Sequence, residues 1–152
     1  MSLTREIRYV CVFYFHDHIH IICVFCIILL MELDKMKCVP CQGGVPTLTD
    51  SEIAQLHPQV SLWSVVKREN DGIKRLERSF EFEDFAEALA FTNKVGELAE
   101  KEGHHPDILT QWGKVTVMWW THKINGLHQN DFVMAAKTDG LYNSLEPNSP
   151  KP

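Results

Sequence analysis

One long segment with helical periodicity lies between two pairs of extended segments, and this order strongly limits the folds open to the chain. Asp84 is placed to cap a helix that runs through Lys101, and Gly103 stands where helices commonly end. Apolar residues recur along it at steps of three and four: Phe85, Ala88, Leu89, Val95, Leu98 and Ala99. Such a stripe suits a partner groove or a protein core, and we interpret it as core packing.

The extended segments predict two hairpins. Before the helix, strands are expected over Trp63–Arg68 and Ile73–Phe82, and the Asn70-Asp71-Gly72 turn between them is typical of a hairpin. After the helix, β-branched and aromatic residues predict strands over Ile108–Trp112 and Val115–His122.

Two shorter helices flank this unit. Thr49 and Glu52 have the spacing of a capping box, so we expect a helix over Asp50–Leu56. A last helix is expected to begin at residue 130 or 131 and to end near 142. The order α-β-β-α-β-β-α predicts an α+β fold of two layers, a four-stranded antiparallel sheet with the helices on one face. The uncovered face and edges of the sheet favour oligomerisation.

The length and the net charge of the chain limit its possible domain number and binding partners. Its 152 residues predict one domain, and a net charge of −5 shows no basic footprint for nucleic acid. We expect the folded domain over residues 48–144. A flexible arm over 31–47 precedes it, and a disordered tail over 145–152 follows it.

An apolar leader occupies residues 1–30. Tyr9–Leu30 approaches the length of a membrane helix, but Asp17 interrupts it at a cost of about 2.5–3.5 kcal/mol on insertion scales. The uninterrupted run, Ile21–Leu30, is the size of a signal-peptide core. We interpret Met31 as the natural start and expect a cytoplasmic protein. A membrane anchor or export signal is the second interpretation, and metal binding by the leader's histidines and cysteines is the third.

The arm contains a Cys-x-x-Cys pair, Cys38 and Cys41. Such a pair is redox-active or half of a zinc site. However, a loop rather than a helix follows it, and no second pair completes a zinc site within residues 31–152. We therefore expect a flexible arm that carries two thiols.

Adjacent histidines are the clearest candidates for chemistry. His104-His105-Pro106 follows the long predicted helix, Glu100 lies one helical turn earlier, and His122 ends a neighbouring predicted strand. Imidazoles exchange protons near neutral pH, so the cluster predicts acid–base catalysis or metal binding. Side chains that are neighbours in extended backbone point to opposite sides, which argues against one tetrahedral ion. A structural role is the third interpretation.

Aromatic residues beside this cluster favour a flat substrate. Trp112, Trp119 and Trp120 are candidates for a stacking wall, with core packing as their alternative. Because Trp119 and Trp120 are neighbours on one predicted strand, one of the two must point away from the other.

The spacing of these residues resembles the signature of the pterin-4a-carbinolamine dehydratases. The matching positions are Glu100, His104, His105, Pro106, Trp112, His122 and Asp131. The match also includes the Phe80–Phe85 segment and the Thr121–Leu127 segment, and it covers roughly Leu48 to Tyr142. Gly103 departs from the pattern, because many members carry an acidic residue at that position.

The resemblance implies a hydro-lyase that converts 4a-hydroxytetrahydropterin to quinonoid dihydropterin and water, without a metal or other cofactor. This reaction recycles the cofactor of aromatic amino-acid hydroxylases, so a hydroxylase is an expected pathway partner. The resemblance also implies a four-stranded α+β fold and a homo-oligomer, either a dimer or a tetramer. The alternative is a non-catalytic partner protein or assembly factor on the same fold.

The resemblance places the active site on three histidines. His105 and His122 are expected to transfer protons, and His104 to hold the pterin ring. The residues expected to bind or orient the substrate are Glu100, Pro106, Trp112, Thr121 and Asp131. Asp131 has a second interpretation as a cap of the last helix.

Overall fold

The computed structural model describes residues 32–39 and 44–145. Both ranges belong to the second of the two units into which the chain divides, residues 31–152. The expectations for the leader, for Cys41 and for the tail beyond residue 145 lie outside the described residues. Within the described ranges, no helix combines the length and the apolar character needed to cross a membrane.

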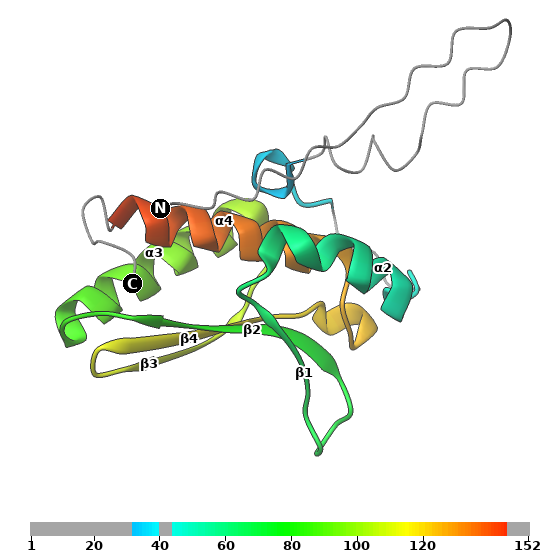
Figure 1. The fold of residues 1–152 in the computed structure, drawn as a ribbon, viewed down its shortest axis with the longest axis horizontal. Coiled ribbons are helices and arrows are strands. Elements are labelled where there is room, and N and C mark those ends of the chain that lie inside the picture. Colours follow the sequence, from blue (N-terminus) through cyan, green and yellow to red (C-terminus); the bar gives the residue numbers. More distant parts are fainter. Residues whose placement is uncertain (1–31, 40–43, 146–152) are drawn as a thin grey trace, which may run out of the picture. The chain divides into compact units, whose positions relative to one another are not determined.

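Four antiparallel strands form one sheet in the order β1-β2-β4-β3. Their bounds are β1 Ser64–Lys67, β2 Lys74–Glu81, β3 Asp107–Gln111 and β4 Lys114–Trp119. The helices are α2 Asp50–Leu56, α3 Phe85–Glu102 and α4 Gln129–Leu145, with short 3-10 helices η1 Leu33–Lys35, η2 His57–Val60 and η3 His122–Ile124. The three α-helices lie on one face of the sheet (Figure 1). The predicted α+β fold is confirmed.

Local signals set the helix ends as expected. Thr49 and Glu52 form both bonds of the capping box at the start of α2. The Asp84 side chain accepts a hydrogen bond of 2.9 Å from the Glu87 backbone N–H at the start of α3. Gly103 ends α3 with φ +64°, a left-handed conformation that favours glycine.

The core lies between the sheet and the helices. On α3 the buried residues are Ala88, Phe91, Val95 and Ala99. The expected stripe was too wide, because Phe85 and Leu89 are 42% and 43% exposed. On the helix-facing side of β2, Leu76 and Phe80 are buried.

One half-buried ion pair ties the sheet to α4. Arg78 on β2 donates to Asp139 on α4, and the Trp63 indole N–H donates to the same carboxylate at 2.8 Å. Burial raises the pKa of Asp139, and the charge of Arg78 opposes that rise. The register of the helix on the sheet is therefore fixed by directional contacts as well as by apolar packing.

The predicted strand over Val115–His122 is too long. β4 ends at Trp119, and His122 begins η3 instead. The chain turns here because Asn125 adopts φ +52° and Thr121 pairs back onto Gly126. The start of α4 also differs: it lies at Gln129, one residue before the earlier expected start.

Two glycines with the same backbone conformation allow a matched test of stability. Gly103 and Gly113 both have φ +64°, but a Cβ at Gly113 would lie 2.9 Å from the Phe82 carbonyl oxygen, whereas one at Gly103 meets nothing within 4 Å. Gly103→Ala is expected to cost about 1–2 kcal/mol, the strain of a left-handed alanine. Gly113→Ala should cost at least about 1 kcal/mol more, from the added clash. Urea unfolding of both variants measures the difference, and equal losses would contradict this geometry.

Candidate active site

The adjacent histidines leave the end of α3 in opposite directions. His104 is 5% exposed and points into the protein, whereas the side chain of His105 is 60% exposed. Gly103 turns the chain out of the helix, and Pro106 favours extended backbone at the residue before it. The divergence expected for neighbouring side chains is confirmed.

His104 is held by a fully buried carboxylate. Its Nε2 lies 2.6 Å from Asp131 Oδ1, and its ring stacks on Trp119 with centroids 5.7 Å apart. Asp131 Oδ2 accepts two further bonds, from the Thr121 hydroxyl at 3.0 Å and from the His128 backbone N–H at 2.7 Å. An ionised carboxylate only accepts, so this network assigns the ring hydrogen to Nε2 of His104.

Asp131 therefore has two structural roles at once. It accepts the backbone N–H of His128, the residue before α4, and so stabilises the first turn of that helix. It also fixes the orientation of His104. The expected capping function and the expected orienting function are both compatible with these contacts.

His105 contacts Glu100 on the solvent side of the loop. Its Nε2 lies 3.0 Å from Glu100 Oε1, and the Glu100 side chain is 81% exposed. The sequence predicts an orienting role for Glu100 without naming its histidine, and the contact is made with His105. Exposed pairs of this kind hold their geometry weakly, so His105 keeps more freedom than His104.

His122 rests on an aromatic stack. Its ring lies 3.9 Å from the Trp120 ring with an interplanar angle of 17°. The Trp120 indole N–H donates to Asp107 Oδ2 at 3.3 Å, and the guanidinium carbon of Arg75 lies 4.6 Å from the Trp120 ring centroid. Cations over tryptophan faces are attracted by the ring quadrupole. Trp119 points to the helices and Trp120 away from them, as the alternation requires.

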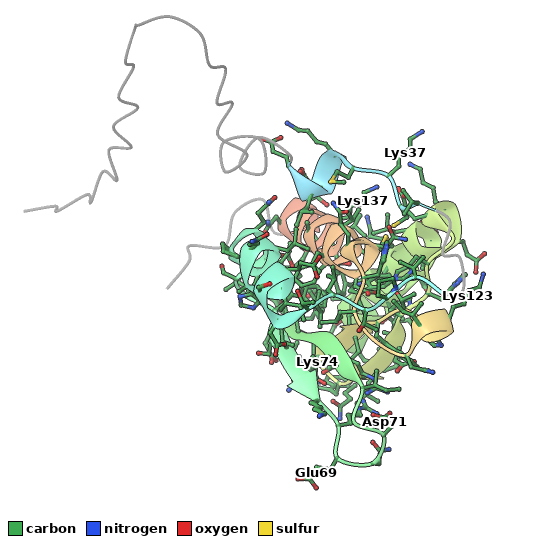
Figure 2. All side chains as sticks on the ribbon, turned by 90° about the vertical axis from the view of Figure 1, so that its right-hand side faces the viewer. Lys37, Glu69, Asp71, Lys74, Lys123 and Lys137 are labelled. Atoms are coloured by element: carbon green, nitrogen blue, oxygen red, sulfur yellow. The ribbon has the colours of Figure 1, made fainter. Side chains whose placement is uncertain are left out.

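Arg75 is anchored at the tip of the β1–β2 hairpin. It is 4% exposed, and it donates from Nη1 and Nη2 to the Asp71 carboxylate at 3.1 and 2.6 Å. Its buried Nε has no hydrogen-bond partner among the described residues. Asp71 lies at the hairpin tip, close to Glu69 (Figure 2). The turn, through Arg75 and Trp120, therefore supports the position of His122.

The Asp71 contact predicts acid sensitivity. The hydrogen bond from Arg75 lowers the pKa of Asp71 from 3.8 to about 2. A depressed folded pKa gives stability that is present above about pH 4 and is lost as pH falls toward 2. Asp71→Asn should therefore be less stable than the parent at pH 6, and the difference should shrink as the pH falls through about 2. Thermal unfolding across this range measures the gap, with Glu69→Gln as the control that leaves it unchanged. A gap that does not close on acidification would contradict this ion pair.

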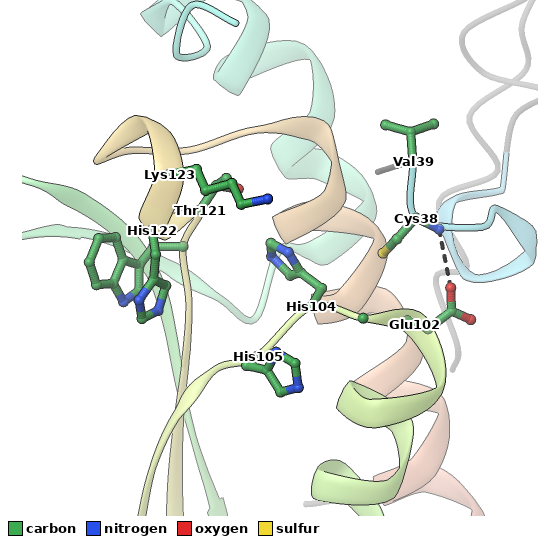
Figure 3. A pocket seen from close by; sticks show the side chains of 10 residues that line it. Cys38, Val39, Glu102, His104, His105, Thr121, His122 and Lys123 are labelled. Atoms are coloured by element: carbon green, nitrogen blue, oxygen red, sulfur yellow. Dashed lines mark hydrogen bonds between the residues drawn. The ribbon is translucent and has the colours of Figure 1, made fainter. Parts of the chain in front are cut away.

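The three histidines border one cavity of about 530 Å³, which suits a small heterocycle. Figure 3 shows His104 and His105 from the loop after α3, and His122 from the segment after β4, around this opening. The lining residues are Cys38, Val39, Glu102, Gly103, His104, His105, Trp120, Thr121, His122 and Lys123. Within the described ranges, no group of three or more His, Cys, Asp or Glu side chains is placed to hold a metal ion.

The expected site residues are not all gathered there. Thr121 lines the cavity, and Glu100 and Asp131 contact histidines that line it. Trp112 does not line it, because it stands 77% exposed at the turn between β3 and β4, at the far end of β3 from the histidines. Pro106 shapes the loop but is also outside the lining.

Sequence reasoning missed two parts of the cavity wall. Glu102 and Lys123 immediately flank the histidine segments, so their proximity was the available signal. Cys38 and Val39 come from the arm expected to be flexible, and no local pattern indicates that they meet the histidines. The flexibility of residues 31–47 remains a prediction, although Leu33 is 2% exposed and packs in the core.

Comparisons of sequence and structure find proteins that resemble this chain. Residues 46–141 match a family model described as pterin 4 alpha carbinolamine dehydratase. A relative from Nitrosococcus oceani, provisionally named a pterin-4-alpha-carbinolamine dehydratase, is 56% identical over 110 residues, which are 72% of this chain and 96% of that protein. A relative from Gloeobacter violaceus with a similar provisional name is 56% identical over 111 residues, 73% of this chain and 94% of that protein.

The fold has a solved counterpart. A crystal structure from Brucella melitensis, of a protein described as a transcriptional coactivator/pterin dehydratase, matches with a TM-score of 0.57 at 33% identity. The match covers 63% of this chain and 98% of that chain.

Proposed function

We propose, because the chain belongs to the pterin 4 alpha carbinolamine dehydratase family, that it removes water from 4a-hydroxytetrahydropterin and releases quinonoid dihydropterin. In this reaction the C4a–O bond breaks and the hydroxyl leaves as water after it gains a proton. N5 loses its proton, and the electron pair of the N5–H bond forms the C4a=N5 double bond. No net electrons or protons are gained.

The two exposed histidines are suited to the proton transfers. His105 and His122 both line the cavity, from separate segments, so they can approach one ring from different sides. One delivers a proton to the leaving hydroxyl, and the other accepts the proton of N5. General acid–base groups of this kind each contribute about 10²–10⁴-fold. The order of acid and base follows the face of the ring that carries the hydroxyl.

His104 is suited to holding the ring rather than to moving protons. Its Nε2 is engaged by Asp131 and its ring lies against Trp119, so its orientation is fixed before substrate arrives. Preorganised polar groups orient a substrate without reorganisation during the reaction. Glu100 positions His105, and Thr121 supports the Asp131 carboxylate.

The observation that carries this proposal is the convergence of three histidines on one cavity of ligand size, within a chain of this family. Purified protein should accelerate formation of quinonoid dihydropterin from 4a-hydroxytetrahydropterin above the spontaneous rate, followed by absorbance. A rate equal to the spontaneous one would contradict the proposal.

A binding role on the same fold is the alternative. In that case an exposed face would recruit a partner, and pull-down of that partner would survive replacement of all three histidines. Cofactor recycling for an aromatic amino-acid hydroxylase, and a homo-oligomeric dimer or tetramer, also belong to this proposal. Leu109 on the edge strand β3 and Trp112 beyond it, 51% and 77% exposed, are apolar surface of the kind that a second copy would cover.

A further inference from the structure

The chain segment before the family-matched region is fastened over the cavity. Asn130, 3% exposed at the start of α4, binds the backbone of Val39 twice. Its Nδ2 donates to the Val39 carbonyl at 2.7 Å, and its Oδ1 accepts from the Val39 N–H at 3.1 Å. One buried amide thus satisfies both polar groups of a single backbone residue, which fixes the direction of the segment as well as its position.

A second anchor holds the preceding residue. The backbone N–H of Cys38 donates to Glu102 Oε2 at 3.1 Å, and the other oxygen of Glu102 binds Lys137 of α4. The hydrogen bond from Lys137 lowers the pKa of Glu102, so this acceptor is ionised at neutral pH. Because the Glu102 and Lys137 side chains are only 11% and 14% exposed, water screens the pair little.

The two anchors determine which side chain faces the histidines. Figure 3 shows the Cys38 side chain directed toward the His104 side of the opening, with Val39 directed away. Successive side chains of an extended segment alternate in this manner. Lys37, on the other side of Cys38, is exposed and points outward (Figure 2).

We propose that Cys38 is a substrate-contacting wall residue that sets how tightly the pterin is held, and that Asn130 and Glu102 are its positioning residues. The inference rests on the proposed dehydration, but it concerns a residue that lies before the matched region, which begins at residue 46. A small, weakly polar and polarisable thiol suits contact with a flat heterocycle, since it packs closely against an apolar ring face.

Such a wall acts on binding more than on chemistry. Cys38 has no assigned proton transfer, and it borders the cavity that the histidines share. Loss of the wall should therefore raise KM while kcat at saturating substrate stays close to the parent value.

Three variants of the full chain test the inference. Cys38→Phe places a ring in the cavity and should raise KM about tenfold or more. Asn130→Ala releases the arm and should raise KM about fivefold, through two lost hydrogen bonds. Lys37→Phe introduces the same ring one residue away, outside the cavity lining, and should leave KM unchanged. Circular dichroism confirms that each variant is folded.

A binding measurement separates this inference from the reaction itself. The probe is 7,8-dihydropterin, titrated against tryptophan fluorescence, since Trp120 lines the cavity. Weaker dihydropterin binding by Cys38→Phe and Asn130→Ala supports the wall even if the parent protein shows no turnover, an outcome that defeats only the proposed reaction. Turnover with KM and dihydropterin affinity unchanged in both variants overturns the wall alone. A parent protein that neither turns over nor binds dihydropterin overturns both.

Discussion

Replacement of Asp131 by alanine is expected to cost about 3 kcal/mol or more of folding stability, because a buried donor that loses its acceptor costs about 1–3 kcal/mol. The carboxylate is fully buried and serves His104, Thr121 and the His128 backbone N–H together. Its removal leaves three donors without their acceptor, two of them buried, and each buried one carries its own desolvation penalty. Urea unfolding followed by circular dichroism measures the loss.

Asp131→Asn separates the structural role from the positioning role. The amide oxygen can still accept from Thr121 and from the His128 N–H, which keeps the helix start. The amide N–H₂ then faces His104 Nε2 and requires that atom to accept, so the ring hydrogen moves to Nδ1. We expect a folded protein with the other tautomer and reduced turnover. Nitrogen NMR of the imidazole reports the tautomer, and an unchanged tautomer would contradict the network.

The second large effect concerns proton transfer. His105→Ala and His122→Ala should each lower kcat about 10²–10⁴-fold, with little change in stability. Both side chains are exposed, so their removal opens no cavity in the core. The measurement is turnover of 4a-hydroxytetrahydropterin at saturating substrate, together with a thermal unfolding curve for each variant.

Lys123→Ala is the matched control for these histidines. Lys123 follows His122 directly, is exposed and lines the same cavity, but it has no assigned proton transfer. Its replacement should leave kcat near the parent value. If both histidine variants turned over at the parent rate, the acid–base assignment would fail even though the family membership stands.

The elements of the fold were predictable where local chemistry decides them. The capping box at Thr49, the hairpin turn at Asn70-Asp71-Gly72 and the left-handed Gly103 each act within a few residues. The strand through His122 was predicted too long because β-propensity alone gives no information about the contact that ends the strand. That contact is the pairing of Thr121 with Gly126, five residues later.

The same distinction between local signals and contacts of distant segments applies to the candidate site. The spacing in the sequence singled out the three histidines as one cluster, and all three line the cavity. What the sequence did not reveal are contacts between distant segments, such as Asp131 with His104, 27 residues apart, and Asn130 with Val39, 91 apart. Nothing in the periodicity of either segment encodes these partners, because they arise only when the segments pack on the sheet.

The stack from Asp71 through Arg75 and Trp120 to His122 has a practical consequence for anyone who modifies this protein. The β1–β2 turn is a surface hairpin tip, which ordinarily tolerates an affinity tag, a fluorophore or an inserted domain. Here Asp71 in the turn binds Arg75. Arg75 in turn packs on the Trp120 ring, which stacks on the candidate catalytic residue His122. A tag or domain inserted at residues 70–72 is expected to disturb these contacts and so to shift the position of the His122 imidazole. A fusion that is intended to leave activity unchanged should therefore be placed in another loop.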